Sequence, residues 1–411
     1  MKTIYLSTAK VMALTMSLGF ALLFCISPFI THSQISYKKF GDGIKFQAAD
    51  STGLIKMSAR IQNLLVVKSD LDGTDPITNA MVRRARLKFD GFAYSTRITY
   101  KIELGLSNRD ISNSRDASLV GGSPKIILDA VVKYEFVKGH TLWFGQTKLP
   151  GNRERVISSQ KLQFVDRSLV NSNFNIDRDF GLQLHHKFKL GNSILKFAES
   201  ISLGEGRNNI KTNNGGFDYT GRTEFLPFGE FTNKGDYFSS DLAREESIKA
   251  SLGFTFDFNH KAIRQGGQLG SILTDTNGAY YQSDLTSFMG DIYIKYKGFS
   301  FLTEATYRES SLGNLISPDG LAYNQGFGLS TQAGYLLKSD YEMAIRYSRI
   351  SPIKGMSAAS VNYQDQYTFG ISKYIMAHNL KFQTDLTYHQ DLGNTFVSNY
   401  LMFRFQTELS F

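Results

Sequence analysis

The sequence has little cysteine and little proline, and both shortages exclude classes of protein. It contains one cysteine, Cys25, among 411 residues, so an intrachain disulfide cannot form and a cysteine-rich metal site is excluded. Seven prolines are too few for a proline-rich linker, and no period of 20 to 50 residues repeats along the chain. A single folded domain is the simplest interpretation.

Long hydrophobic runs are also missing after the first 30 residues. A membrane helix needs about 20 consecutive apolar residues, and only residues 11–30 approach that length. Aromatic residues nevertheless make up 13% of the chain, which also has 36 glycines. A transmembrane β-barrel has this composition, because only alternate strand residues face lipid while the others face a polar lumen.

The N-terminus has the features of an export signal. Lys2 and Lys10 precede the apolar run, and small residues follow it, so cleavage after Ser33 is expected. A retained membrane helix is the alternative, but Pro28 and the small residues at the exit favour cleavage. We therefore predict a signal peptide at 1–33, a short periplasmic segment at 34–53 and a barrel domain at 54–411. Loss of two lysines changes the net charge from +9 to +7.

The last twelve residues, YLMFRFQTELSF, alternate strictly between apolar and polar side chains. Phe405, Leu409 and Phe411 share the apolar face, because successive strand residues point to opposite faces. An amphipathic last strand with a terminal aromatic residue is typical of outer-membrane barrels. We expect these three residues to act as the insertion signal that the barrel-assembly machinery recognises.

Sixteen amphipathic segments of this kind can be placed along the chain. They span 54–67, 80–94, 98–107, 125–137, 141–148, 179–188, 193–204, 246–258, 262–271, 286–297, 299–310, 326–337, 341–350, 365–375, 379–390 and 397–411. Among the residues assigned to lipid are Met81, Met343 and Ile345. The segment 262–271 has almost no apolar face and is included because the alternation of turns requires it.

The connections between these segments alternate in length. Tight turns are expected at 95–97, 138–140, 190–192, 297–298, 338–340 and 377–379, and long loops at 108–124, 149–178, 205–245, 311–325 and 351–364. Short periplasmic turns and long extracellular loops are typical of outer-membrane proteins. The sequence thus predicts an all-β fold, a 16-stranded antiparallel transmembrane β-barrel. We expect the barrel to lie in the outer membrane of a Gram-negative bacterium, in contact with the lipids of that membrane.

The face opposite lipid carries more basic than acidic residues. Arg60 lies on one strand, and Arg84, Arg86 and Lys88 lie at every second position of the next. Such like charges repel each other unless anions or acidic side chains lie opposite. An excess of positive charge in a lumen lowers the cost of anion passage.

The loop at 149–178 combines charge with apolar residues. It carries Arg153, Arg155, Arg167 and Arg178, and it also carries Phe164, Leu169, Val170 and Phe174. Folding into the lumen would bury these apolar side chains and narrow the pore. Folding outward, over the rim or against a partner subunit, is the alternative.

Four sequence segments resemble the phosphate-selective porins O and P. They are RRARLKFDG at 83–91, ITYKIELGLSNRD at 98–110, FGQTKLPGNRE at 144–154 and NIDRDFGLQL at 175–184. The resemblance covers most of the chain after the signal and is clearest at 55–184. It implies a homotrimeric channel with inward-folded loops and an arginine-rich lumen. It also implies that Arg84, Arg86, Arg153, Arg155 and Arg178 line the pore or its constriction, without assigning the residues that select phosphate.

No motif for catalysis, for a cofactor or for nucleic-acid binding is present. The adjacent His185 and His186 would point to opposite faces of a strand, so they cannot bind one metal ion together. We therefore expect an anion-preferring channel for small anions such as phosphate, without a cofactor. The alternatives are a general porin, a gated transporter, or a structural or adhesive barrel with a closed lumen.

Overall fold

The computed structural model describes residues 34–36, 40–73, 75–111, 125–209, 213–353, 363–392 and 399–411. The predicted signal peptide at 1–33 lies outside these residues. Within them, none of the helices has the length and apolar character needed to cross a membrane.

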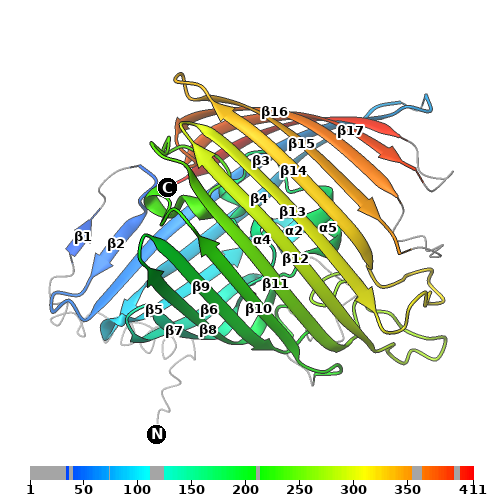
Figure 1. Ribbon diagram of the computed structural model, residues 1–411, viewed down its shortest axis with the longest axis horizontal. Helices are drawn as coiled ribbons and strands as arrows, with labels where there is room; N and C mark the ends of the chain where they lie inside the picture. The colour runs from blue at the N-terminus through cyan, green and yellow to red at the C-terminus, as the bar shows by residue number, and fades with distance from the viewer. Residues whose placement is uncertain are drawn as a thin grey trace, which may run out of the picture.

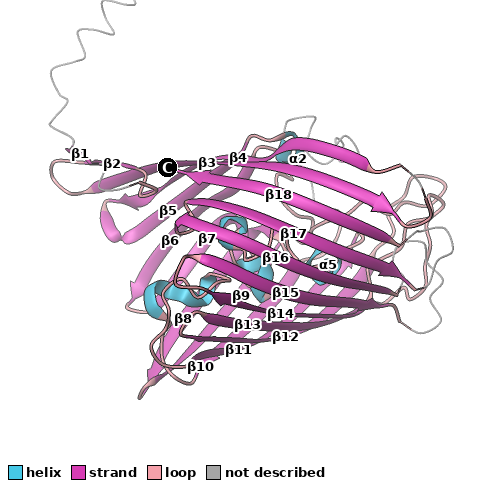
Figure 2. Ribbon diagram, turned by 90° about the horizontal axis from the view of Figure 1, so that it is seen from above, coloured by secondary structure: helices cyan, strands magenta, loops and turns pink. Residues whose placement is uncertain are grey.

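The main feature is one antiparallel sheet that closes into a barrel, and this confirms the predicted fold class (Figures 1 and 2). The barrel strands are β3 (Gly53–Asp70), β4 (Ile77–Ala93), β5 (Ser95–Gly105), β6 (Ile127–Val137), β7 (His140–Lys148), β8 (Arg178–Leu190), β9 (Ser193–Ser202), β10 (Asp218–Leu226), β11 (Lys249–Ala262), β12 (Ser283–Tyr296), β13 (Phe299–Ser310), β14 (Gly326–Leu336), β15 (Tyr341–Ser351), β16 (Gln364–Met376), β17 (Leu380–Asp391) and β18 (Tyr400–Ser410). Closure occurs where β18 pairs with β3, from Tyr400 opposite Asp70 to Ser410 opposite Arg60. A closed sheet satisfies the backbone hydrogen bonds that lipid cannot.

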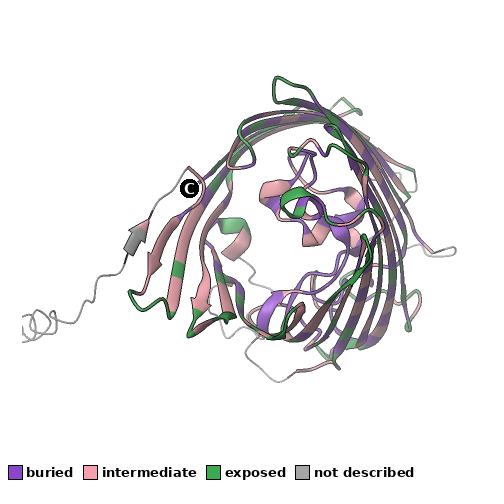
Figure 3. Cartoon of the chain, turned by 60° about the vertical axis from the view of Figure 1, so that its left-hand side comes forward, coloured by how far each residue is buried: buried purple, intermediate pink, exposed green. Residues whose placement is uncertain are grey.

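Alternation along each strand separates an apolar outer face from a polar inner face. On β15, Met343 and Ile345 are 51% and 62% exposed, whereas Glu342 and Arg346 are buried. On β18, Phe403 and Phe405 are exposed, and Gln406 is buried. The inner face is buried because polypeptide fills part of the lumen (Figure 3).

The predicted strand at 262–271 is wrong. Residues 263–282 form a loop with two isolated bridges, Arg264 with Ile272 and Thr274 with Tyr280. The missing strand is β10, inside the segment that we predicted as a loop at 205–245. It pairs with β9 on one side and with β11 on the other. The two errors cancel in the strand count.

A bulge in β4 changes the face of its first half. Gln62 pairs with Arg84, but the next residue of β3, Asn63, pairs with Val82, so Arg83 is the extra residue. Val82 is consequently exposed on the outside, and Met81 lies opposite the inward Leu64. The prediction that Met81 faces lipid is therefore wrong.

Two short strands precede the barrel. β1 (Gln34–Ser36) pairs with β2 (Ile44–Gln47), and β2 pairs with the first residues of β3, below the end of β18. They lie in the segment 34–53 that we predicted as periplasmic. They extend the sheet beyond the rim where the short turns lie (Figure 1).

Candidate pore and constriction

The connection between β7 and β8, residues 149–177, lies inside the barrel and is called the first inserted segment. It contains α4 (Arg153–Val156), η2 (Ser159–Lys161) and α5 (Leu169–Phe174), and the helices lie within the ring of strands (Figure 3). Its aromatic side chains fit against glycines of the wall. A Cβ atom at Gly370 would lie 2.9 Å from Phe164, and one at Gly328 would lie 2.9 Å from Phe174.

Carboxylates of the wall hold the first inserted segment in place. Glu304 accepts hydrogen bonds from the Asn152 side chain (2.8 Å) and from the backbone N–H of Glu154 (3.0 Å). Glu342 accepts one from the Gln163 side chain at 2.7 Å. Buried carboxylates need such donors, so these contacts determine where the segment sits.

A second inserted segment, residues 227–248, enters from the rim of the short turns between β10 and β11. It contains η3 (Thr232–Tyr237). Lys295 of the wall donates to the carbonyl oxygens of Gly235 (2.8 Å) and Ser240 (2.6 Å), and the Ser240 hydroxyl donates to Glu342 at 2.6 Å. The prediction of an external loop is wrong for this part of 205–245.

The two inserted segments touch each other inside the lumen. The backbone N–H of Ser239 donates to the carbonyl oxygen of Lys161 at 3.0 Å, and Arg153 donates to the carbonyl oxygen of Asp236 at 3.4 Å. The lumen is therefore narrowed from both ends. One segment enters from the long-loop side and the other from the short-turn side.

An open cavity of about 1040 Å³ remains between the inserted segments and the wall formed by β4 to β10. Sixteen basic and six acidic residues line it, a difference of ten positive charges. The basic residues are Arg83, Arg84, Arg86, Lys101, Arg109, Lys133, Lys148, Arg155, Lys161, Arg167, Arg178, Lys187, Lys196, Arg207, Arg222 and Lys234, and the acidic ones are Glu103, Asp110, Asp129, Glu135, Asp177 and Glu224. A cleft lined by such an excess of one sign of charge concentrates ions of the opposite sign.

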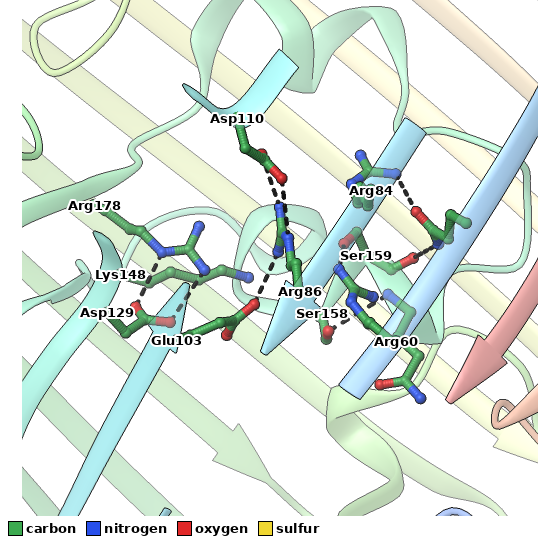
Figure 4. A network of polar contacts seen from close by, with 12 residues as sticks. Arg60, Arg84, Arg86, Glu103, Asp110, Asp129, Lys148, Ser158, Ser159 and Arg178 are labelled. Carbon is green, nitrogen blue, oxygen red and sulfur yellow. Dashed lines mark hydrogen bonds and ion pairs between the residues drawn. The ribbon is translucent and has the colours of Figure 1, made fainter. Parts of the chain in front are cut away.

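Five of the predicted pore residues line this cavity, and four of them form ion pairs. Arg84 lies 3.4 Å from Asp166. Arg86 lies 2.9 Å from Glu103, and Arg178 lies 3.0 Å from Asp129 (Figure 4). Arg155 donates to Asp177 at 2.7 Å, whereas Arg167 donates only to backbone carbonyl oxygens, at 2.9 and 2.8 Å.

The other three predicted pore residues do not line the cavity. Arg153 is 0% exposed and lies 3.0 Å from both Glu224 and Asp291, so it attaches the first inserted segment to the wall. Arg60 donates to the Ser159 hydroxyl at 2.6 Å (Figure 4). Lys88 forms an ion pair with Asp90 at 2.8 Å.

Eleven basic residues of the cavity were not among the predicted pore residues, and four of these illustrate why. Arg83 enters through the bulge, and Arg222 lies on the unpredicted strand β10. Lys148 donates to three carbonyl oxygens at the end of α4, and Arg207 reaches the cavity from the loop after β9. A polar residue at every second position from Asp218 to Glu224 was the one sequence signal for any of them.

Three lysines of the cavity have, among the residues that the structure describes, neither a carboxylate within ion-pair distance nor a carbonyl oxygen as hydrogen-bond acceptor of the ammonium group. Lys133 lies over the ring of Trp143 at 3.3 Å, Lys161 lies over the ring of Phe238 at 3.6 Å, and Lys234 is exposed at the tip of the second inserted segment. Burial, followed by the repulsion of Lys88, Lys234 and other lysines, lowers the pKa of Lys161 to about 8. Its ammonium group is thus charged at neutral pH and loses its charge in mild alkali.

The fold and the lined lumen together resemble one class of proteins, the outer-membrane porins. Within that class, the family model of the phosphate-selective porins O and P matches residues 55–235, which confirms the resemblance found in the sequence. No group of three or more potential metal ligands occurs in the described part of the chain. The similarity to this family and to the porin fold favours a channel.

Solved porin structures share the fold at low sequence identity. An anion-selective porin from Comamonas acidovorans has a TM-score of 0.53 at 10% identity, covering 87% of this chain and 100% of its own. The channel DcaP of Acinetobacter baumannii has 0.52 at 13% identity, covering 89% and 99%. The trimer form of OmpT from Vibrio cholerae has 0.51 at 10% identity, covering 88% and 100%. A search of curated proteins gave no match.

Proposed function

We propose that this porin is an anion-preferring channel for the passive or facilitated diffusion of small anions such as phosphate across the outer membrane. The observation that supports this most is the lining of the cavity, with sixteen basic against six acidic residues. A positive lumen attracts anions and repels cations, and the low-dielectric wall around it increases both effects.

The arrangement of the charges supports a path for mobile anions. Most basic residues of the lining form ion pairs with carboxylates or donate hydrogen bonds to backbone carbonyl oxygens. Some of these contacts, such as Arg84 with Asp166 and Lys148 with Arg155, attach the first inserted segment to the wall. Lys133, Lys161 and Lys234 are not paired in this way. Cations without a fixed counterion are available to a passing anion.

Phosphate is the finer part of the proposal. A doubly charged oxyanion gains more than chloride from several neighbouring cations, since the Coulomb energy scales with its charge. We further propose that the protein is a homotrimer, because OmpT of Vibrio cholerae, which shares the fold, has a trimer form.

The experiment is a reversal-potential measurement in planar bilayers with a potassium chloride gradient at pH 7. A potential of the sign set by chloride supports the anion channel, and the sign set by potassium contradicts it. The absence of conductance would favour the structural barrel with a closed lumen. Phosphate added to the chloride solution should reduce the chloride current if phosphate binds, and leave it unchanged if the porin is general.

The trimer has its own measurement. Mobility in SDS gels without heating should correspond to three chains, and heating should convert the band to one chain. A monomer in mild detergent, measured by light scattering, would contradict the trimer and leave the channel proposal intact.

A further inference from the structure

Two histidines that are far apart in the sequence lie against each other on the outer face of the barrel. His140 begins β7 and pairs across the sheet with His186 of β8. Their Nδ1 atoms are 2.6 Å apart, and their ring centroids are 4.9 Å apart. The sequence neighbours His185 and His186 point to opposite faces, as predicted. His185 stacks on Trp143 inside the barrel, with 4.0 Å between the ring centroids.

The position of this pair is at the short-turn rim. His140 directly follows the turn at Lys138–Gly139, which joins β6 to β7. Phe188, which is 40% exposed on the outer face, lies 5.3 Å from the ring of His140 and 6.1 Å from the ring of His186. The two rings therefore lie on the outer face of the wall, at a rim where His186 also borders the cationic cavity.

Two imidazole nitrogens in such close contact need a proton or a metal ion between them. Two imidazole nitrogens at 2.6 Å can share one proton, with one as donor and the other as acceptor, but they cannot both carry a proton. No carboxylate lies within ion-pair distance of either ring in the described part of the chain. Two lone pairs directed at one point form an arrangement that a metal ion binds in place of the shared proton.

We propose that His140 and His186 form a binding site for a divalent transition-metal ion of the class Cu²⁺, Zn²⁺ or Ni²⁺, with water in the remaining positions. Imidazole nitrogen suits these ions, whereas Mg²⁺ and Ca²⁺ prefer oxygen ligands. With metal–nitrogen bonds of about 2.0 Å in tetrahedral geometry, the two nitrogens would stand about 3.3 Å apart. Rotation of the two side chains is enough to move the Nδ1 atoms from 2.6 Å to this distance, without a change in the backbone register.

The experiment uses full-length protein without a histidine tag, purified in detergent, and titrated with Cu²⁺. We expect one tight equivalent with the electron paramagnetic resonance signature of two nitrogen ligands. We also expect quenching of Trp143, the only tryptophan of the chain, because it lies three residues from His140 on the same strand. Excess EDTA should reverse both signals, and magnesium should produce neither.

Variants distinguish this pair from other histidines. His186→Ala should weaken Cu²⁺ binding at least tenfold and remove the two-nitrogen signature, and His140→Gln should do the same. His185→Ala is the matched control, since it removes the neighbouring imidazole on the lumen side, and it should keep one tight equivalent. Heat-dependent mobility in SDS gels verifies that each variant is folded. Unchanged binding in both His186→Ala and His140→Gln, or loss of binding in His185→Ala alone, would overturn the proposal.

Discussion

Neutralising Lys133, Lys161 and Lys234, the cavity lysines with neither carboxylate nor carbonyl partners among the described residues, tests the anion preference most directly. The triple variant Lys133→Gln, Lys161→Gln and Lys234→Gln keeps side chains of similar length and removes three positive charges from the cavity lining. None of the three lysines forms an ion pair with a carboxylate of the inserted segments within the described residues, so the substitutions remove no such contact. The barrel and its constriction should therefore stay in place.

The expected magnitude follows from Coulomb's law. The interaction energy between one charge and an ion about 8 Å away is about 0.5 kcal/mol in water. Salt at about 0.1 M reduces this energy to about half. Each lysine both attracts anions and repels cations, so its loss should lower the chloride-to-potassium permeability ratio about twofold. Loss of all three should lower the ratio about tenfold, because distant charges add.

The assay is the reversal potential in planar bilayers at pH 7. The control variant removes the same net charge from the rims and the outer face, through Arg97→Gln, Arg349→Gln and Lys373→Gln, where the wall and the solvent screen the lumen. The reasoning is refuted if the two triple variants shift the permeability ratio equally. It is also refuted if the lumen variant leaves the ratio at the wild-type value.

Three further predictions concern pH, the inserted segment and assembly. Because the lowered pKa of about 8 leaves Lys161 charged below that pH and neutral above it, anion preference should fall between pH 7 and 9, and Lys161→Gln should flatten this dependence in reversal-potential measurements. Glu304→Ala removes the acceptor of two hydrogen bonds of the first inserted segment, at a cost of about 1–3 kcal/mol, and should increase single-channel conductance, whereas Glu309→Ala on the outer face of the same strand should not. Deletion of Phe411 should lower the outer-membrane level on immunoblots far more than Leu401→Ala on the same strand; equal levels would argue against a terminal insertion signal.

Much of the barrel could be predicted from the sequence because strand alternation is a local property. On β15, Tyr341, Met343 and Ile345 are exposed and Glu342 and Arg346 are buried, as every second position predicts. Lipid and lumen impose opposite requirements on neighbouring residues, so the pattern needs no knowledge of distant contacts.

The strand β10 could not be predicted in the same way. Its outer face carries Gly221 and Thr223 between Tyr219 and Phe225, so its apolar alternation is weak. The parity of the turns still required another strand, and this requirement placed one wrongly at 262–271. A bulge such as the one at Arg83 is similarly invisible, because the added residue is of the same type as Arg84, which follows it.

The constriction is a property of the assembled barrel rather than of any one segment. Apolar residues in a charged loop predicted the first inserted segment, because Phe164 and Phe174 pack in the space beside Gly370 and Gly328. The second inserted segment depends on donors that lie about 60 residues further along the chain, above all Lys295.

Because the inserted segments are attached to the wall through ion pairs, a simple count of basic residues does not give the charge that an anion meets in the cavity. Arg153 lies between Glu224 and Asp291, and its charge is matched inside the protein. Lys161 is held by a backbone contact to the second segment and has no such match. An anion in the cavity meets the charge that remains after the inserted segments have been attached to the wall. The selectivity of this porin is therefore expected to depend on where those segments sit as much as on how many basic residues the strands carry.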